Sequence, residues 1–530
     1  MTRETPRNCP HARHEDRPEL SRPGGRLHWF LRSWFIVNSV LAGFLALCWL
    51  LLRTGAKPSR FAYPCQQAAF SAASLAFAAP LLSALVTARR GLVQGMRTPS
   101  GVAAAMAGLS MTLGLWGHSS LAEELRSAGT AAPLDYQAQV FRVTDCPQQP
   151  SGDRFVGLDN LLTLMGSHGL KLYRSASTSP LAGPAGIIAG NDVVVVKINY
   201  QWDERGGTNT DLLRGLIRAI VDHPDTFTGE VVVAENAQFN SVSNFDRPAN
   251  NAEDHSLSPH DVVVGFQTLG YNVSHSDWTT IRYTSVGEYS DGDSQDGYIV
   301  YDYDAQLSGR VSYPKFETGD GTFISLRDGI WDPGASTYDR DRLKFINLPV
   351  LKSHHATYGV TGCVKHYMGV ATRELSTNSH SAIGNGLLGA LIGEIRPADL
   401  NILDCIWVNA NPFDGPWTGY GDATRLDQLV ASTDPVATDI WAATEILIPA
   451  FLDNGYNPPW PSPEATPDDP GSAFRIYLDN SMSRILDAGF TVTNDLGQIE
   501  AFTWDGVQEL PVFSDGFESG DTRHWSTTTP

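Results

Sequence analysis

The residues best suited to chemistry lie in one short stretch, Phe345–Gly369, which reads FINLPVLKSHHATYGVTGCVKHYMG. An apolar run ends at Lys352, two histidines follow, and Lys365 and His366 come after a turn rich in glycine and threonine. A buried strand that ends in cations and imidazoles beside small turn residues is a common way to build an anion or metal site at the edge of a sheet. The candidate catalytic residues are therefore Lys352, His354, Lys365 and His366.

These side chains suit an anionic small molecule as ligand. A lysine is a point cation that fits phosphate or carboxylate, and a histidine can ligate a metal or move protons near neutral pH. Gly359, Thr361 and Gly362 can bring backbone N–H groups close to an anion, and we assign them to ligand binding. The alternative is a polar loop whose lysines are solvated. The sequence also leaves open whether His354 or His355 points inward.

Two valine-rich strands are expected to add polar groups to the same place. Asn191–Asn199 (NDVVVVKIN) and Glu230–Glu235 (EVVVAE) flank a helical pattern over Asp211–Asp222, which predicts two parallel strands. Open α/β sheets bind ligands at the carboxyl ends of their strands. The expected ligand-binding residues at these ends are Lys197, Asn199, Glu235 and Asn236. Alternatively, Lys197 and Glu235 form only a buried ion pair that stabilises the sheet.

Three aspartates further along the chain are candidate metal ligands. Asp404 lies inside a buried strand pattern, Leu400–Val408, while Asp434 precedes and Asp439 lies within a helical pattern over Val436–Leu447. If these carboxylates met the histidines, an oxygen and nitrogen site for a divalent metal would follow. The alternatives are that Asp434 caps its helix and that Asp439 binds a lysine.

Several familiar cofactors and partners are excluded by what the chain lacks. None of the six cysteines forms a C-x-x-C pair, so we expect no iron–sulfur cluster. No G-x-G-x-x-G follows the first strand, and the chain has no Walker loop and no G-x-S-x-G, so we expect no dinucleotide. The segment Asp291–Gly297 fails the calcium-loop pattern, since Asp296 stands where glycine is needed. A net charge of −20 argues against nucleic acid.

The first 120 residues predict a membrane anchor. Trp34–Leu52 is a charge-free apolar run long enough to cross a bilayer, and Ala68–Thr87 and Val102–Trp116 are weaker candidates. The arginine-rich N-terminus favours the cytoplasm. With three spans the large acidic domain lies outside the cytoplasm and with two it lies inside. We expect a bacterial inner membrane protein with a periplasmic domain, where Cys65 and Cys146 could pair.

The predicted fold class is α/β, with a parallel or mixed sheet flanked by helices, an aromatic and acidic β-like insertion, and N-terminal transmembrane helices. The predicted parts are a basic cytoplasmic tail at 1–33, a membrane region at 34–120, a linker at 121–150, the α/β domain at 151–510 with an insertion at about 261–340, and a C-terminal tail at 511–530.

Five segments in this order resemble the domain of unknown function family 362, a widespread prokaryotic family. The segments are VVVVKINY, VVVAEN, INLPVLKSHHATYGVTGCVKHYMG, ILDCIWV and LVASTDPVATDIWA, so that the resemblance spans about residues 192–446. Lys57–Gln67 resembles membrane-attached members. The resemblance implies an α/β domain but no reaction. Some relatives carry ferredoxin-type cysteine clusters, which this chain lacks.

Three hypotheses follow from these patterns. The first is an enzyme-like domain that binds an anionic small molecule, with or without a divalent metal, in a crevice lined by lysine, histidine and aspartate. The second is a non-catalytic envelope module that captures a ligand or partner in the same crevice. The third, an accessory role in electron transfer, loses its main support because the cluster cysteines are missing.

Overall fold

The computed structural model describes residues 136–146, 152–238, 245–376, 380–458, 460, 469–505 and 509–510. The chain divides into two units, Met1–Glu123 and Glu124–Pro530, and all described residues belong to the second. The predicted basic tail, membrane segments and C-terminal tail, together with Cys65, lie outside the described residues and stay predictions. Cys146 is a free, buried thiol.

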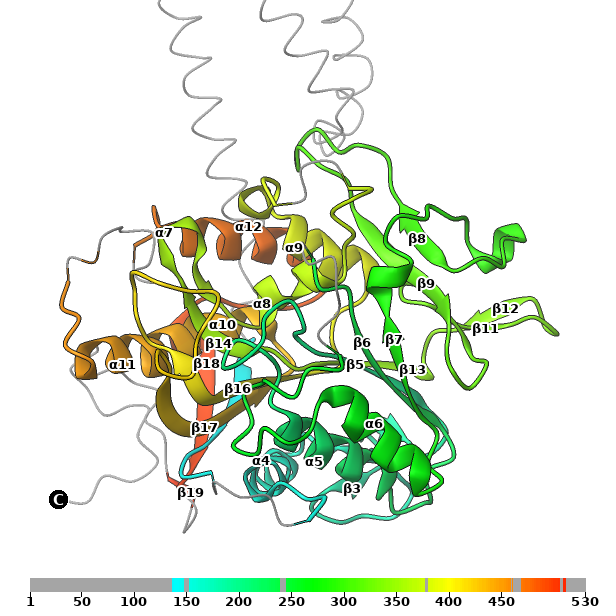
Figure 1. Ribbon diagram of the computed structural model, residues 1–530, viewed down its shortest axis with the longest axis horizontal. Helices are drawn as coiled ribbons and strands as arrows, with labels where there is room; N and C mark the ends of the chain where they lie inside the picture. Colours follow the sequence, from blue (N-terminus) through cyan, green and yellow to red (C-terminus); the bar gives the residue numbers. More distant parts are fainter. Residues whose placement is uncertain are drawn as a thin grey trace, which may run out of the picture. The chain divides into compact units, whose positions relative to one another are not determined.

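The centre of the described part is a mixed sheet of eleven strands (Figure 1). Nine strands follow the order β19-β18-β1-β17-β16-β13-β5-β6-β7, while β14 pairs with β16 and β15 pairs with β14. Their bounds are β1 Ala138–Val143, β5 Val193–Lys197, β6 Glu230–Glu235, β7 Val273–Asp277, β13 Leu343–Asn347, β14 Val350–His354, β15 Gly359–Thr361, β16 Leu400–Asn409, β17 Thr424–Ser432, β18 Ile499–Trp504 and β19 Glu509–Leu510. The mixed α/β fold with a sheet between helices is confirmed.

The predicted strand–helix–strand unit forms as expected. β5 and β6 are parallel, with Val193 opposite Glu230, and every residue of both strands is buried. The helix between them, α5 (Thr210–Val221), begins where the Asn209 side chain accepts hydrogen bonds from two backbone N–H groups. A run of β-branched valines suits a strand that is covered on both faces.

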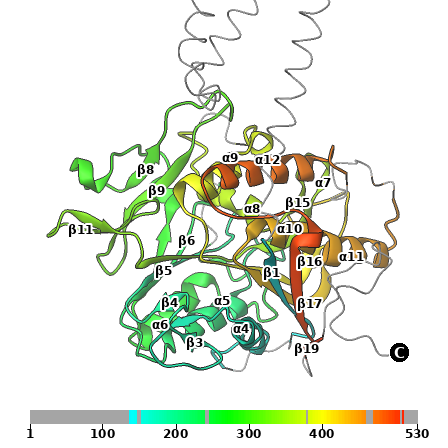
Figure 2. The ribbon, with the colours of Figure 1, turned by 180° about the vertical axis from the view of Figure 1, so that it is seen from behind.

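Helices cover both faces of this sheet (Figures 1 and 2). Val194 and Val196 pack in a core with α4 (Val156–Ser167), α5 and α6 (Pro259–Thr268). The alternate residues, Val193 and Val195, pack on the other face in a core that contains residues from α9 (Leu387–Ala390), α10 (Pro435–Ala442) and α12 (Ala473–Asp487). Successive strand side chains point to opposite faces, which explains this division.

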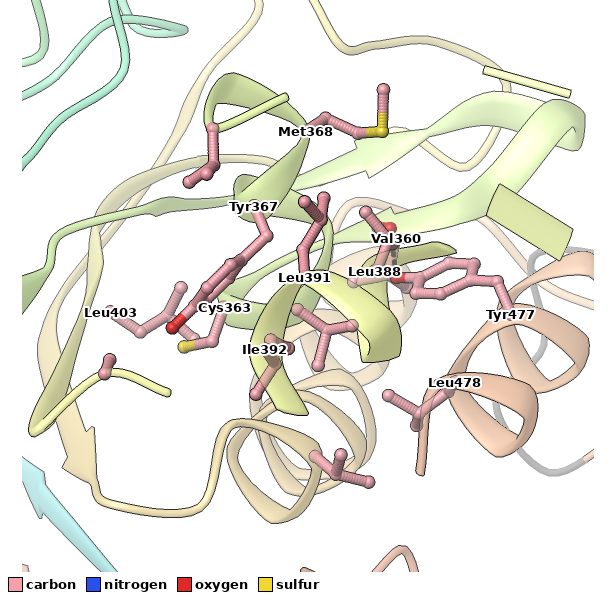
Figure 3. Packing of buried hydrophobic residues seen from close by; sticks show 14 of the residues in the cluster. Val360, Cys363, Tyr367, Met368, Leu388, Leu391, Ile392, Leu403, Tyr477 and Leu478 are labelled. Atoms are coloured by element: carbon pink, nitrogen blue, oxygen red, sulfur yellow. Dashed lines mark hydrogen bonds between the residues drawn. The ribbon is translucent and has the colours of Figure 1, made fainter. Parts of the chain in front are cut away.

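The second core holds the segment that follows β14 (Figure 3). Cys363 and Tyr367, from α8 (Cys363–His366) and the turn after it, point into the apolar cluster beside Leu388 and Leu391. On α12, Tyr477 donates a hydrogen bond to the Val360 carbonyl at 2.8 Å. The histidine and lysine segment is therefore fixed by burial of its apolar residues, and it is not a solvated loop.

The predicted insertion is smaller than expected. A separate antiparallel sheet has the order β12-β11-β10-β9-β8, and its strands are β8 Gly297–Val300, β9 Ser312–Glu317, β10 Phe323–Ser325, β11 Gly329–Asp332 and β12 Thr337–Asp339. The earlier part of the expected insertion forms α6 and β7 instead, and β7 extends the main sheet beside β6. A Ser258 capping box begins α6, a signal that the β-like reading of this segment missed.

Two further boundaries differ from the sequence prediction. The end of the expected linker forms β1, a strand inside the main sheet. The helix expected over 436–447 runs as α10, a π-helical turn at Ala443–Leu447 and then α11 (Ile448–Asp453). Among the described residues, Pro435–Asp453 is the one helical stretch long and apolar enough to cross a membrane, and it is 72% buried, as expected of a core helix. A small sheet of β2 (Tyr173–Arg174), β3 (Ala182–Gly183) and β4 (Ile188–Ala189) completes the fold.

Candidate functional site

A pocket of about 310 Å³ opens at the carboxyl ends of β5, β6 and β14. These strands run in one direction, because β13 is parallel to both β5 and β16, and β16 is parallel to β14. The lining residues are Lys197, Asn199, Gln201, Trp202, Glu235, Gln238, Lys352, His354, Thr357, Tyr358, Thr361, Lys365, His366, Met368, Gly369, His380 and Pro416. The carboxyl edge is where an open α/β sheet is expected to bind a ligand.

The pocket brings together eight of the residues that the sequence singled out. They are Lys197, Asn199, Glu235, Lys352, His354, Thr361, Lys365 and His366. All four candidate catalytic residues are in this set, and they come from β14 and α8. Chain segments about 150 residues apart therefore converge on one cavity.

Three lysines line this cavity, and each is held differently. Lys197 forms an ion pair with Glu235, and both side chains are at most 3% exposed. Gly369 lies against this pair, where any Cβ atom would contact the lysine and both carboxylate oxygens. Lys352 donates a hydrogen bond from Nζ to the carbonyl of Gly206 at 2.6 Å. The Nζ atom of Lys365 lies 4.8 Å from the centre of the Tyr358 ring.

Burial shifts the pKa of every lysine in the pocket downward. For Lys352, burial and then the charges of Lys365 and Lys197 lower the pKa to about 7. Burial alone lowers the pKa of Lys365 to about 7. The pKa of Lys197 is also lowered by burial, although the charge of Glu235 opposes the change. Near neutral pH, Lys352 and Lys365 can each gain or lose a proton at small free-energy cost.

A chain of amide groups sets the tautomer of His366. The side chain of Asn401 donates a hydrogen bond to the Ser432 carbonyl, and its oxygen accepts one from the Asn347 amide. The Oδ1 atom of Asn347 lies 2.6 Å from Nδ1 of His366. Since Asn347 also donates to the Cys363 carbonyl, its oxygen must accept, and Nδ1 must carry the proton. The lone pair of the neutral ring is then on Nε2.

The buried His366 ring stays neutral. Burial, followed by the charges of Lys197 and Lys352, lowers its pKa well below the usual range, and the nearby Ile198 carbonyl opposes only part of this change. Its Nε2 atom has no hydrogen-bond partner among the described residues. In contrast, His354 is engaged, because its Nδ1 atom lies 2.8 Å from the Thr361 hydroxyl. His354 lines the pocket, and the side chain of the adjacent His355 lies outside what the structure describes.

Two amide side chains also have unused hydrogen-bonding atoms. Within the described part of the chain, Oδ1 of Asn199 and both polar side-chain atoms of Gln238 make no hydrogen bond, although these residues are only 7% and 4% exposed. Ala237 and Gln238 both have positive φ angles near +50°, which is uncommon outside glycine. Strain of this kind persists only where surrounding structure holds it, here beside a pocket.

The predicted backbone anion site is occupied by the protein itself. Gly359 and Thr361 pair with β14, and Gly362 precedes α8. The first N–H groups of α8, from Cys363 and Val364, donate to the Asp439 carboxylate at 2.5 and 2.9 Å. The role proposed for Gly359 and Gly362 as donors to a ligand is therefore corrected: neither lines the pocket, and the carboxylate that the turn binds is Asp439. Thr361 does line the pocket, and its hydroxyl lies 2.8 Å from Nδ1 of His354.

Asn236 also has a structural role. Its amide donates to the Ala371 carbonyl and to the Tyr298 hydroxyl, and its oxygen accepts from the Gln238 backbone N–H. The side chain is thus fully engaged and does not line the pocket. These bonds fix the turn that places Gln238 at the pocket wall, so that Asn236 supports the site from behind.

The three aspartates proposed as metal ligands do not form a metal site. Asp434 caps α10, and its other oxygen accepts from Thr493. Asp404 accepts from the Ile406 N–H and from Asn251. Among the described residues, no group of three or more histidine, cysteine, aspartate or glutamate side chains could hold a metal. Burial raises the pKa of Asp404 to about 6 and those of Asp434 and Asp439 to about 7.

Sequence reasoning missed several pocket residues. Trp202 and Gln238 follow the two valine strands by a few positions, so the rule that places ligands at strand ends would have found them had it been extended into the loops. Tyr358 lies inside the Phe345–Gly369 stretch but was not among the expected site residues. No sequence signal points to His380, whose pKa is lowered to about 4 by burial and the charge of Lys365.

Comparison with known proteins supports the family assignment for part of the chain. Residues 341–444 match the family model of the domain of unknown function DUF362. The match contains the Phe345–Gly369 stretch. β5 and β6 lie before the matched residues, and only the short sequence segments quoted above connect them with the family. No curated protein and no solved structure matches the chain significantly.

Proposed function

We propose that this chain, whose residues 341–444 are a DUF362 segment, binds a small anionic molecule in the pocket at the carboxyl ends of β5, β6 and β14. The observation that carries the proposal is the pair Lys352 and Lys365. Both line the cavity, and neither forms an ion pair with a carboxylate among the described residues. A protein with a net charge of −20 thus concentrates uncompensated cations at one place.

The free energy of burial supports a functional reason for these lysines. Placing an ammonium group in a protein interior destabilises the fold unless a partner compensates. Lys197 has such a partner in Glu235, whereas Lys352 has only a carbonyl and Lys365 an aromatic ring. A bound phosphate or carboxylate would provide the missing charge and would favour the protonated form of the lysine that it contacts.

The pocket also has groups to recognise the rest of the ligand. Asn199 and Gln238 offer buried amide atoms without partners, and His366 offers Nε2 as an acceptor. Leaving such atoms unpaired costs about 1–3 kcal/mol each, so a ligand that pairs them gains specificity as well as affinity. We include no metal in the proposal, since Asp404, Asp434 and Asp439 use their oxygens on amide groups of the protein.

The test is ligand-dependent stabilisation of the purified full chain. We expect phosphate, sulfate and small carboxylates to raise the thermal midpoint, while sodium chloride at equal ionic strength has no such effect. A ligand at a hundred times its Kd adds ~2.7 kcal/mol of stability. Lys365→Met should abolish the effect, and Lys171→Met, outside the pocket, should retain it. If no anion stabilises the chain, or if Lys365→Met responds like the native protein, the proposal is wrong.

Turnover separates an enzyme from a capture module. Lys352 and Lys365 can exchange protons near neutral pH, and the neutral His366 ring can accept a hydrogen bond at Nε2, which favours an enzyme. A ligand that co-purifies and is recovered chemically unchanged after long incubation would favour capture instead. The expected readout is a new compound that forms with the native chain and not with His366→Ala.

The membrane anchor is part of the same proposal. The apolar run Trp34–Leu52 and the arginines around it favour an inner membrane protein whose domain faces the periplasm. An alkaline phosphatase reporter fused after Ser120 is expected to be active. Activity of a cytoplasmic reporter at the same position would show that two spans, and not three, precede the domain.

A further inference from the structure

The three lysines of the pocket differ in what occupies their amines. Lys197 is held by Glu235 and by the carbonyl of Ile198, and Lys352 is held by the carbonyl of Gly206. Only Lys365 has an amine that makes no hydrogen bond or ion pair with any described residue. Its Nζ atom lies 4.8 Å from the centre of the Tyr358 ring, and its charge lowers the pKa of Lys352 and of His380. The pocket therefore contains two anchored cations and one unanchored amine.

The surroundings of Lys365 suit a nucleophile. The residue is 7% exposed, yet it faces the cavity and so can reach a bound molecule. Its position on α8 is fixed, because Cys363 and Val364 on the same turn donate to Asp439. Burial lowers its pKa to about 7, so that about half of the amines are free bases at neutral pH. Desolvation beside other cations is a known way to activate a lysine amine.

We infer that Lys365 forms an imine with the carbonyl carbon of an oxo acid or a phosphorylated carbonyl compound, while Lys352 binds its anionic group. This inference rests on the proposed anion site and names the class of ligand. An anion without a carbonyl group would use the cations but would leave the free amine unused. A carbonyl compound that carries an anion uses both.

The step balances without a redox partner. The free amine of Lys365 attacks the carbonyl carbon, and an Nζ–C bond forms as the carbonyl oxygen takes up a proton. The amine nitrogen of the resulting carbinolamine then loses a proton, and the hydroxyl group, protonated in turn, leaves as water. A free amine, a carbonyl compound and one proton thus give a protonated imine and water. The released proton passes to water in the open pocket, while the neutral His366 ring can accept a hydrogen bond from the carbinolamine at Nε2, because its Nδ1 proton is committed to Asn347.

Reductive trapping tests this inference on the full chain. The protein is incubated at neutral pH with pyruvate, glyoxylate or glycolaldehyde phosphate and with sodium cyanoborohydride, which reduces an imine to a stable secondary amine. Peptide mass spectrometry then locates the adduct. We expect at least one probe to label Lys365 faster than any exposed lysine by about tenfold or more, since the free-amine fraction is higher by ~10³. Omitting the reductant should leave no stable adduct.

Variants assign the roles of the two lysines. Lys365→Arg keeps the charge and should lose the adduct, whereas Lys352→Met should still be labelled at Lys365 but only at higher probe concentration. Lys171→Met, outside the pocket, should label like the native chain. Thermal unfolding of each variant shows that it is folded before labelling is compared.

Each other outcome has a definite meaning. Labelling spread over exposed lysines, or centred on Lys352, would overturn the assignment to Lys365. If the probes raise the thermal midpoint but give no adduct, the imine is wrong and the anion site stands. If they neither stabilise nor label, both this inference and the proposed function are wrong.

Discussion

Replacing Lys352 by methionine is expected to stabilise the ligand-free protein, and to do so most at low pH. The lysine is 1% exposed, and burial together with the charges of Lys365 and Lys197 lowers its pKa from 10.5 to about 7. In the unfolded chain the lysine has its ordinary pKa and is charged throughout this range. Folding must therefore either bury the charge or release its proton.

The magnitude follows from proton linkage. Between about pH 7 and pH 10.5 the unfolded state binds more protons than the folded state, so the contribution of Lys352 to stability rises with pH in that window. The lysine destabilises the fold by ~5 kcal/mol at about pH 6 and by ~3 kcal/mol at about pH 8.5. Methionine removes this destabilisation but loses the hydrogen bond to Gly206, worth ~1 kcal/mol. The gain from Lys352→Met should therefore shrink by ~2 kcal/mol as the pH rises.

The assay is urea unfolding of the native full chain and the variant at about pH 6, 7 and 8.5, in a buffer without phosphate. The difference between the two proteins reports Lys352 together with its effect on the charged groups around it, His366 and Asp404 among them, because distant titrating groups are the same in both. Lys171, which donates to backbone carbonyls outside the pocket, provides the control: Lys171→Met should change stability equally at each pH. A variant that is less stable than the native chain at pH 6, or a difference that does not change with pH, would refute the reasoning.

Three other predictions concern the pocket and its support. Gly369→Ala should destabilise the fold by about 1–3 kcal/mol in urea unfolding, since its Cβ would press on the ion pair between β5 and β6, whereas Gly384→Ala, with open space around it, should be close to neutral. Asp439→Ala should leave two buried N–H groups unpaired and cost about 2–6 kcal/mol. This loss should be larger at pH 5 than at pH 8, because burial raises the pKa of Asp439 from 3.8 to about 7 and its contribution to stability falls as the pH rises through that value. Sulfate affinity, measured by calorimetry, should fall from pH 6 to pH 8.5 because Lys352 and Lys365 lose protons over this range. Sulfate binding should then be accompanied by proton uptake. An affinity that does not change with pH would contradict this prediction. Among the described residues, the charged or titratable groups around these lysines include Lys197, Glu235, Asp404, His354, Tyr358, His366 and His380.

Local patterns were enough to predict the elements that carry the chemistry. The valine runs of β5 and β6 and the side chain of Asn209 specify a strand–helix–strand unit through burial and capping, which act over a few residues. Because the carboxyl ends of parallel strands share one edge, Lys197 and Glu235 could be placed together in advance. Their pairing was one of the alternatives left open, and the structure shows that the ion pair forms within the pocket wall.

The sequence could not show which carboxylate the turn of small residues would bind, or which strands would pair with one another. A turn of small residues binds a carboxylate whether it belongs to a ligand or to the protein, and only the packing of α10 against α8 brings Asp439 to Cys363. Similarly, the expected linker becomes β1 because β17 and β18 are both available to pair with it. Asp439 and Cys363 are 76 positions apart, and β1 lies hundreds of positions from β17 and β18, so no local pattern distinguishes one partner from another.

The DUF362 segment does not make the site alone. It supplies Lys352, Lys365 and His366, but the ion pair and the unpaired amides come from the loops and strand ends before it, at Lys197–Asn199 and Glu235–Gln238. Even the tautomer of His366 depends on a chain of amides that ends at β17. The recognised segment therefore supplies two of the three pocket lysines and His366, whereas the third lysine and the unpaired amides come from the ends of β5 and β6 and the loops after them.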